Sequence, residues 1–399
     1  MTGPMQGIKV VELGIWVAAP AAGSILADWG ADVIKIEAPG GDPLRSASAA
    51  VLPPDVRTNP HFNADNRGKR SMVLDLRTEE GRTQLLALLD SADVFISNVR
   101  AAGLARLCLD PETVLARNPR LVYAAITGYG LTGPKADVAG FDLGVFWAYG
   151  GIADLLTAPE SAPPIQRSGM GDHHTGLAAA AAVSAALLHR ERTGEGQLVS
   201  TSLLRTAAYQ IAGDLNAKLM IDEDPVHYDR RTAWNPLWNN YETGDGRRLW
   251  LINPASDAAW PLFAALAGRD DWLADPRYAT QAGRTEHCTE LVAQFDEVFA
   301  SRTFQEWTAL LAGQPRVLWA PVNTVDDLLA DPQTTAAGAI VEVEEIPGTT
   351  RQIANPVEFH GTVCASPRRS PELGEHTELI LAELAADSTS WPAQQMVSS

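Results

Sequence analysis

The sequence of 399 residues predicts an α/β protein with a second, smaller α+β domain. Two observations support this prediction. Short apolar runs alternate with segments of helical apolar spacing over the first 126 residues, and from about residue 225 this alternation gives way to a hairpin pattern and further helices. Strands that alternate with helices are joined by crossover connections, so they form a mostly parallel sheet.

The first part of the chain contains a βαβ unit. The strand pattern "IKVVELG" is followed by the helical segment "PAAGSILADWG", which Pro20 starts and Gly30 ends, and then by the strand pattern "VIKIE". The alternation continues through the strands "SMVLDL", "DVFISN" and "LVYAAI", separated by the helices "TEEGRTQLLALLDSA" and "PETVLARNP". This order predicts a Rossmann-like, mostly parallel sheet.

The pattern becomes less regular after residue 128. Residues 128–151 are rich in glycine and aromatic side chains, and loops of this length in compact domains are usually functional. Two helices are expected next, at about 175–191 and 197–219, with the glycine-rich turn "RTGEGQ" between them.

The smaller domain begins with a hairpin whose turn is marked by Asp245 and Gly246. Helices are expected near residues 258–267, 284–300 and 303–312. Later in the chain, a second hairpin is expected around Pro347 and Gly348, followed by a C-terminal helix over "LGEHTELILAEL".

Composition and sequence pattern disfavour several classes of protein. A formal net charge of −18 and a pI near 4.8 disfavour binding to nucleic acid or to an anionic membrane through overall charge. The longest apolar run, residues 177–188, is too short to span a membrane, which needs about 20 residues. The N-terminus has no signal-peptide pattern, so a cytoplasmic protein is expected. Three cysteines far apart predict neither a disulfide framework nor a zinc knuckle.

One segment, residues 45–77, has a basic excess in this acidic chain. It is either a solvated loop or a site for an anionic ligand. Its charged side chains are Arg45, Arg57, Arg67, Lys69, Arg70 and Arg77 against Asp55, Asp65 and Asp75.

Common cofactor motifs are missing or incomplete. Gly128, Gly130 and Gly133 match the spacing of a dinucleotide fingerprint, but the residues that follow lack the apolar period of a helix. Neither a nucleophile elbow nor a phosphate-binding P-loop occurs. His173 and His174 are adjacent rather than four residues apart, so no metal site is expected.

Asp172 lies in "GMGDHHTG", directly before an alanine-rich helical segment. The residue could cap that helix, or its carboxylate could attack an activated acyl group, and the two roles are compatible. The helix dipole is expected to favour the ionised form of the carboxyl. Gly169, Gly171 and Gly176 remove side chains around it, which the close approach of a bulky substrate would require.

With these residues in place, the chain resembles the class III CoA-transferase family, which also includes formyl-CoA transferase, carnitine CoA-transferase and α-methylacyl-CoA racemase. The resemblance covers nearly the whole chain. It rests on ordered stretches that include "LADWGADVIKIEAPGGDPLR", "FNADNRGKRSMVLDLRTEEG", "NPRLVYAAITGYGLTGP", "GMGDHHTG" and "APVNTVDDLLADPQ".

The resemblance implies an enzyme that moves CoA from an acyl-CoA to a free carboxylic acid. Asp172 would be the nucleophile, through anhydride and aspartyl-CoA thioester intermediates. CoA and acyl-CoA would be substrates, with no tightly bound cofactor. The matching positions for CoA binding are Val17, Arg45, Lys69, Arg70, Asn98, Arg100 and Arg106.

The resemblance also implies an interlocked homodimer with a large domain of residues 1–224 and 326–399 and a small domain of residues 225–325. Phe141 stands where racemases of this family carry a histidine, which disfavours racemisation. An acyl-CoA racemase or isomerase, and a CoA-binding protein without catalysis, remain alternatives.

Four tryptophans lie in the stretches that would line the acyl pocket: Trp16, Trp147, Trp234 and Trp238. They indicate either a larger, less polar acyl group or ordinary core packing.

Overall fold

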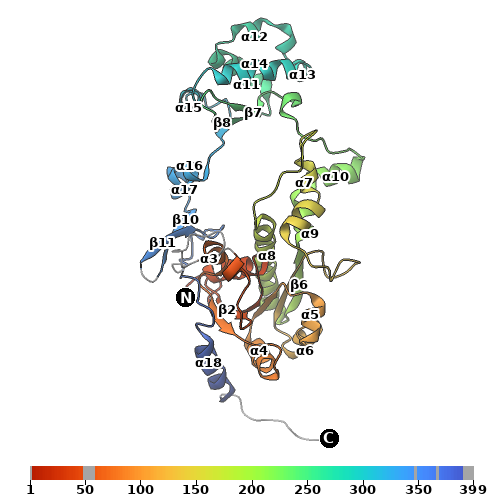
Figure 1. The fold of residues 1–399 in the computed structure, drawn as a ribbon, viewed down its shortest axis with the longest axis vertical. Helices are drawn as coiled ribbons and strands as arrows, with labels where there is room; N and C mark the ends of the chain where they lie inside the picture. The colour runs from red at the N-terminus through yellow and green to blue at the C-terminus, as the bar shows by residue number, and fades with distance from the viewer. Residues whose placement is uncertain (1, 48–58, 346–347, 365–367, 390–399) are drawn as a thin grey trace. The chain divides into compact units, whose positions relative to one another are not determined.

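The computed structural model describes residues 2–47, 59–345, 348–364 and 368–389 (Figure 1). The chain divides into two compact units. The larger comprises Met1–Ala153, Ile165–Asp224 and Ala336–Ser399, and the smaller comprises Asp154–Pro164 and Pro225–Thr335. The smaller unit therefore includes a short excursion before residue 165, and it ends later than the expected residue 325.

The larger unit is built on a six-stranded sheet in the order β3-β2-β1-β4-β5-β6. Every neighbouring pair is parallel, so the prediction of a mostly parallel sheet is confirmed. The chain order reverses between β1 and β4, and this switch point opens a crevice at the carboxyl ends of the two strands. The strands are β1 (Lys9–Leu13), β2 (Asp32–Glu37), β3 (Arg70–Val73), β4 (Val94–Ser97), β5 (Val122–Thr127) and β6 (Gln197–Ser202).

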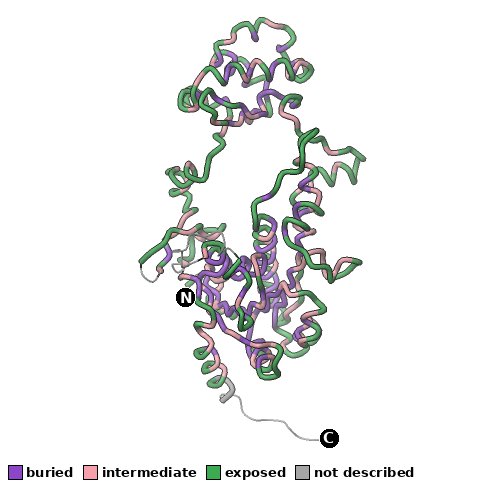
Figure 2. Tube along the Cα trace, in the orientation of Figure 1, coloured by how far each residue is buried: buried purple, intermediate pink, exposed green. Residues whose placement is uncertain are grey.

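Helices cover both faces of this sheet, and the buried residues gather where they meet it (Figure 2). On one face, α1 (Ala18–Asp28) and α8 (Met170–Thr193) pack on residues such as Val10, Val94 and Val122. On the other face, Val11 and Phe95 pack against helices from the intervening segments. Those helices are α4 (Glu79–Ser91), α5 (Ala101–Arg106), α6 (Pro111–Arg117) and α18 (Thr377–Thr389).

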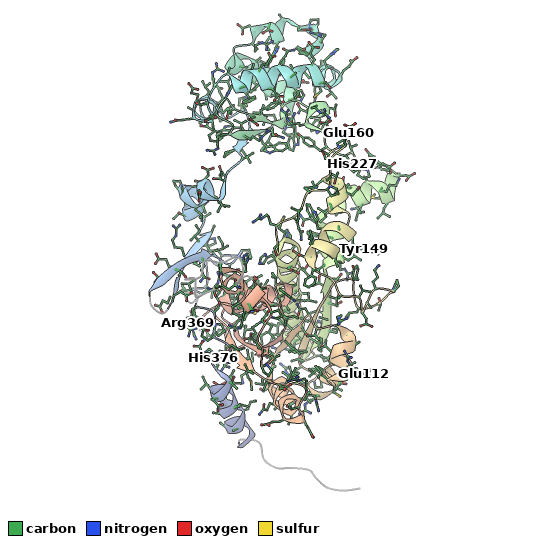
Figure 3. The ribbon with its side chains drawn as sticks, viewed as in Figure 1. Glu112, Tyr149, Glu160, His227, Arg369 and His376 are labelled. Carbon is green, nitrogen blue, oxygen red and sulfur yellow. The ribbon has the colours of Figure 1, made fainter. Side chains whose placement is uncertain are left out.

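The C-terminal segment covers the edge of the sheet at β3. The backbone N–H of His376, labelled in Figure 3, donates to the Ser71 carbonyl at 2.9 Å, and the N–H of Val73 donates to the Thr377 hydroxyl at 3.0 Å. An edge covered in this way is protected from pairing with another chain.

The expected helix over residues 197–219 is wrong in its first part. Residues 197–202 form β6, which pairs with β5, and helices α9 (Leu203–Gln210) and α10 (Ala212–Ile221) follow. The alternation of β-branched and polar residues in "QLVSTS" suits a strand at a sheet edge.

The larger unit also contains a helix type that was not expected from the sequence. The stretch around residue 145, expected to be irregular, contains a π-helix, η1 (Leu143–Tyr149). A π-helix is frequently found at a functional site.

The other elements of this unit are α2 (Leu44–Ala47), α3 (Pro60–Asn66), and the antiparallel pair β10 (Ile340–Glu344) and β11 (Thr349–Ile353). Two helices, α7 (Ile152–Leu155) and α17 (Pro332–Ala336), cross the boundaries between the units. The second hairpin is thus confirmed, although Pro347 in its turn lies outside the described residues.

The smaller unit is an α+β arrangement. Its three strands, β7 (Trp238–Glu242), β8 (Arg248–Ile252) and β9 (Trp319–Pro321), form an antiparallel sheet with the expected turn at Asp245 and Gly246. Its helices are η2 (Arg230–Thr232), α11 (Ser256–Ala267), α12 (Asp270–Ala274), η3 (Pro276–Tyr278), α13 (Gln281–Glu286), α14 (Cys288–Ala300), α15 (Phe304–Ala312) and α16 (Val325–Ala330). Leu249, Leu251, Trp260 and Phe295 belong to its own core, separate from that of the sheet.

Neither unit has a helix that is long and apolar enough to cross a membrane, among the residues that the structure describes.

Candidate active site

Asp172 is the third residue of α8, not its N-cap. The N-cap is Gly169, whose φ of +84° is a left-handed conformation that glycine adopts without strain. The capping hypothesis for Asp172 is therefore wrong. No hydrogen bond to its carboxyl is found among the described residues, so the group is held by its place in the first turn of the helix rather than by a partner.

Asp142 fixes the turn that precedes α8. One carboxyl oxygen accepts from the N–H of Leu143 at 2.7 Å and the other accepts from the N–H of Gly169 at 2.9 Å. Asp142 is buried and begins η1, so it joins the π-helix to the start of α8. This tether sets the position of Asp172 three residues later.

Two of the three glycines around Asp172 serve packing rather than substrate approach. A Cβ at Gly171 would lie 2.4 Å from the Phe146 ring, and one at Gly176 would lie 2.9 Å from the Ala18 carbonyl oxygen of α1. The expectation that these glycines clear room for a substrate is therefore wrong for Gly171 and Gly176. They allow η1 and α1 to pack closely against α8.

His173 is paired with a buried aspartate. Its Nε2–H donates to Asp65 of α3 at 2.9 Å, and the Asp65 side chain is 5% exposed while that of His173 is 53% exposed. The hydrogen bond that His173 donates to Asp65 raises the pKa of His173, which favours the imidazolium form. His174 points elsewhere: its Nδ1–H donates to the Met170 carbonyl at 2.6 Å.

The environment of Asp172 disfavours ionisation. Burial is the largest cause and, together with the nearby Asp142 and Asp65, it raises the pKa of the carboxyl to about 7, although His173 opposes the rise. The expectation that the ionised form would be favoured is therefore wrong, because desolvation and the neighbouring carboxylates raise the pKa. A carboxyl with such a pKa is both ionisable and reactive at neutral pH.

A buried charge network supports the loop between β1 and α1. Lys35 Nζ donates to Glu12 at 3.1 Å and to Asp42 at 2.9 Å, and Asp42 accepts from the Trp16 N–H at 3.2 Å. Trp16 has a φ of +64°, a strained conformation for a non-glycine residue. The buried ions thus hold the chain in the conformation that leads to Val17, the N-cap of α1.

Several residues predicted to bind CoA meet at the carboxyl ends of the strands. Asn98 follows β4 and binds both the N–H and the carbonyl of Ile15, at 3.0 and 2.7 Å, which joins the loops on either side of the switch point. Arg100 begins α5 and Arg106 ends it, and both are exposed. No carboxylate partner of either arginine is found in the described part of the chain.

The other predicted basic residues already have protein partners. Arg45 pairs with Glu37 at 2.8 Å. Lys69 has a side chain with no exposed surface, and its Nζ lies 2.7 Å from Glu12 and 2.8 Å from the Pro20 carbonyl. Burial lowers the pKa of Lys69 to about 8. Of the remaining charged residues in segment 45–77, Asp55 and Arg57 lie outside the described residues.

Arg70 lies at the opposite edge of the sheet. It is the first residue of β3 and pairs with Asp32, the first residue of β2, at 2.6 Å and with Glu383 of α18 at 2.8 Å. The structure therefore brings Val17, Asn98, Arg100 and Arg45 to the carboxyl edge and leaves Arg70 at the amino edge.

Two cavities of the larger unit flank these residues. One of about 480 Å³ lies over the carboxyl ends of β1 to β4 and is lined mainly by apolar residues such as Leu13, Ile36 and Val99, with Glu37 and Arg77 among its polar residues. Another of about 380 Å³ lies between α1, α3 and α8 and is lined by Asp65, His173, His174 and residues 353–356. Asp172 lines neither of these two cavities.

The tryptophans named from the sequence have different surroundings. Trp16 contacts Phe141 edge-to-face with ring centroids 5.6 Å apart, and Phe141 is 61% exposed. Trp147 belongs to a buried cluster with Phe146 and Leu203, so it is a core residue. Trp234 and Trp238 contact each other in the smaller unit.

Sequence reasoning missed two acidic residues of this site. Asp65 and Asp142 are close to neither Asp172 nor each other in the sequence, and only the fold brings them to the start of α8. Asp142 directly follows Phe141 in "AGFD", so a search for carboxylates beside that position would have found it. No group of His, Cys, Asp and Glu suited to a metal ion occurs in the described ranges.

The larger unit is thus an α/β protein with a parallel sheet and a carboxyl group at a helix start near its switch point, and comparisons identify the family. The model of CoA-transferase family III matches residues 5–377. A cinnamoyl-CoA:phenyllactate CoA-transferase from Clostridium sporogenes is 33% identical over 387 residues, which cover 96% of this chain and 94% of that protein. A succinate–glutarate CoA-transferase from Agrobacterium fabrum is 34% identical over 397 residues, 96% of each chain.

A solved structure agrees with these sequence comparisons. The crystal structure of a CAIB/BAIF family protein from Brucella suis has a TM-score of 0.86 and 34% identity, and it covers 96% of this chain and 100% of that chain. The chain belongs to CoA-transferase family III. It is an enzyme that transfers coenzyme A, and its substrates are CoA thioesters and carboxylic acids.

Proposed function

We propose that Asp172 is the nucleophile of this CoA-transferase. The observation that carries the proposal is the Asp172 carboxyl itself, which lies in the first turn of α8 without a hydrogen-bond partner in the described residues and has a pKa near 7. An unpartnered, partly desolvated carboxylate is a stronger nucleophile than one held by hydrogen bonds.

The reaction proceeds by two exchanges on Asp172. The carboxylate attacks the donor thioester, CoA leaves as thiolate, and a mixed anhydride forms. The thiolate then attacks the aspartyl carbonyl of this anhydride, which releases the donor acid and leaves an aspartyl-CoA thioester. The acceptor carboxylate repeats the sequence in reverse and leaves as the new acyl-CoA.

We propose that CoA binds at the switch point of the sheet. The cavity of about 480 Å³ has an apolar lining that suits an adenine ring, and exposed Arg100 and Arg106 on the neighbouring helix suit phosphate groups. Val17 and Asn98 lie on the loops between this cavity and the start of α8. Lys69 and Arg45 have a structural role in this proposal. Their ion pairs with Glu12 and Glu37 hold the loop between β1 and α1 and the end of β2 in place.

We propose further that the enzyme is a cytoplasmic, interlocked homodimer whose partner subunit completes the acyl site. Asp172 lines neither cavity described above, so a closed acyl pocket requires additional surface. The larger unit also exposes apolar side chains on α9 and α10 that a partner would cover: Tyr209, Leu219, Met220 and Ile221.

The acyl group is proposed to be larger and less polar than a small dicarboxylate. Val17 lies beside Gly169 at the start of α8, and the preceding residue Trp16 contacts Phe141, so apolar side chains gather near this helix start. A racemase on this scaffold needs a second base on the opposite side of the α-carbon, and the exposed phenyl ring of Phe141 cannot supply it. Exchange of the α-proton with deuterated water, without any acceptor acid, would favour that alternative.

Asp172→Asn tests the proposed nucleophile. Because the amide cannot form the anhydride, we expect CoA transfer to fall by at least about 10⁴-fold while the dissociation constant for CoA changes by less than about 3-fold. A screen of acyl-CoA donors against carboxylic acids, read by mass spectrometry, supplies the substrates. Full turnover by the variant would overturn the assignment, and loss of both CoA binding and turnover would indicate misfolding, which circular dichroism checks.

A further inference from the structure

The Asp65–His173 pair is not used by the reaction described above. Asp65 is buried on α3, and α3 is fixed at its start by Asn59, whose side chain accepts from the N–H groups of His61 and Phe62. The rigid carboxylate holds one nitrogen of the imidazole at 2.9 Å, whereas the ring itself is half exposed. A buried carboxylate that orients an exposed imidazole is the arrangement by which enzymes prepare a histidine for proton transfer.

The second ring nitrogen of His173 faces the start of α8. An ideal Cβ at Gly169 would lie 3.4 Å from Nδ1 of His173 and 3.7 Å from Cγ1 of Val17. The absence of a side chain at residue 169 therefore leaves Nδ1 open beside Val17. The same turn carries Asp172, the neighbour of His173 in the chain.

We propose that His173 is a second catalytic residue of the transfer reaction, whose Nδ1–H donates to the sulfur of the thioester, with Asp65 as its positioning residue. The inference rests on the function proposed above, because it requires Asp172 to expel a CoA thiolate. Nε2 remains bound to Asp65 throughout, so the imidazole keeps its orientation while Nδ1 gains and loses a proton.

The step balances within the site. Asp172 Oδ forms a bond to the acyl carbon, the carbon–sulfur bond breaks, and its electron pair leaves on sulfur. The Nδ1 proton of the imidazolium moves to that sulfur, which leaves a neutral imidazole on Asp65. When the thiol attacks the aspartyl carbonyl, the proton returns to Nδ1 and the donor carboxylate departs. No oxidant, reductant or external base is consumed.

The surrounding charges favour an imidazolium at rest. Asp65 from α3, Asp172 from α8 and Asp142 from the segment before η1 all raise the pKa of His173. The other charged groups of the adjoining cavity, Asp28 and Arg67, form an ion pair with each other at 2.6 Å. His174, which also lines this cavity, is turned to the Met170 carbonyl.

The test compares two donors of the same acyl group. One is the CoA thioester, and the other is the thioester of 4-nitrothiophenol, whose thiolate leaves without help from an acid. Rapid quenching and mass spectrometry of the Asp172 peptide measure the rate of acylation in the wild type, His173→Gln and the matched control His174→Gln. Thermal denaturation checks that all three proteins are folded.

We expect His173→Gln to acylate at least about 100-fold more slowly with the CoA thioester and within about 5-fold of the wild type with the aryl thioester. His174→Gln should stay near the wild type with both donors. In Asp65→Asn, the pKa of His173 falls, so acylation by the CoA thioester should decline at a lower pH than in the wild type, as the imidazolium loses its proton earlier.

The outcomes distinguish failure of this inference from failure of the proposed function on which it rests. If the wild type forms no adduct on Asp172 with either donor, the nucleophile assignment fails and the role of His173 fails with it. If the wild type forms the adduct and His173→Gln does so equally fast, only the role of His173 is overturned. Equal losses with both donors, or equal losses in the two histidine variants, would also overturn it, since they indicate a structural effect.

Discussion

At the scale of single residues, Asp172 shows how burial changes the chemistry of a side chain. The sequence predicts the residue and its place before a helix, but its pKa depends on Asp65 and Asp142, which lie 107 and 30 positions away and arrive through the fold. The sign of the pKa change follows from desolvation, which no local pattern reports. The sequence therefore predicted which residue is the candidate nucleophile, but it did not predict the surroundings that set the pKa of that residue.

The pH dependence of the enzyme follows from this pKa. For the proposed nucleophile Asp172, attack on the thioester requires the ionised carboxylate, so kcat/KM should rise with pH up to about 7, the pKa of Asp172, and then stay level until the proposed acid His173 loses its proton. A pH–rate profile with a saturating acyl acceptor measures this limb. A profile that is already flat between pH 5 and 7 would contradict the partly buried environment of the carboxyl.

Asp172 should also reduce the stability of the fold. Its pKa is near 4 in the unfolded chain and about 7 in the folded one, so the folded state binds the extra proton between these values. The resulting destabilisation is absent below pH 4, grows as pH rises from 4 to 7, and is complete above 7. The full difference corresponds to at most about 4 kcal/mol, and partial exposure makes it smaller.

Asp172→Asn should therefore be more stable than the wild type at pH 8 and equally stable at pH 4. Urea unfolding at the two pH values measures both free energies of unfolding. This gain at the expense of activity is typical of strained functional sites. Equal stability at pH 8 would indicate that the carboxyl is better solvated than the structure shows.

At the scale of helices and strands, the sequence predicted best where apolar spacing and end signals agree. The βαβ unit, both hairpins and the helix expected at about residues 175–191, which the structure extends to residues 170–193, meet that condition. The missed elements are short or polar. "FNADN" has too few apolar residues to reveal α3, and the polar sequence of β6 becomes a strand only because β5 offers its free edge.

The contact between α1 and α8 gives an element-scale prediction. A Cβ at Gly176 would lie 2.8 Å from the Ala21 Cβ and 2.9 Å from the Ala18 carbonyl oxygen, so Gly176→Ala must push the helices apart. We expect a loss of about 1 to 3 kcal/mol in the free energy of unfolding. Because α8 carries Asp172 near its start, the rate of transfer should fall too.

Gly213→Ala is the matched control, since an added Cβ in α10 meets no atom within 4 Å. It should leave the stability unchanged or raise it by up to about 1 kcal/mol. Chemical denaturation and steady-state assays of the two variants check both effects. Unchanged stability of Gly176→Ala would mean that the helices adjust without strain.

At the scale of the whole molecule, an acidic protein can bind an anionic substrate if exposed basic residues are concentrated at the binding site. The net charge is −18, yet Arg100 and Arg106 are exposed beside the switch point, and most other basic residues near the sheet are neutralised by carboxylates. The sequence predicted a local excess of positive charge over residues 45–77. It did not predict that Lys69 and Arg70 would be bound internally, because partners such as Glu12 and Glu383 are remote in the chain.

The apolar surface of α10 leads to the last prediction. Leu219 and Met220 are 81% and 80% exposed, although each would lose favourable free energy in contact with water, and a homodimer interface would bury them. The double variant Leu219→Asp/Met220→Asp should therefore weaken association, because two charges would be desolvated at the interface. Sedimentation velocity over a range of protein concentrations measures the oligomeric state.

Leu379→Asp is the control, since Leu379 is exposed on α18, which packs on the sheet of its own unit through Ile380. We expect the wild type and this control to sediment as dimers and the double variant to shift toward the monomer. If the partner subunit completes the acyl site, CoA transfer should fall with the dimer fraction, whereas CoA binding at the switch point should persist. A monomeric double variant that keeps full activity would show that one chain holds the whole site.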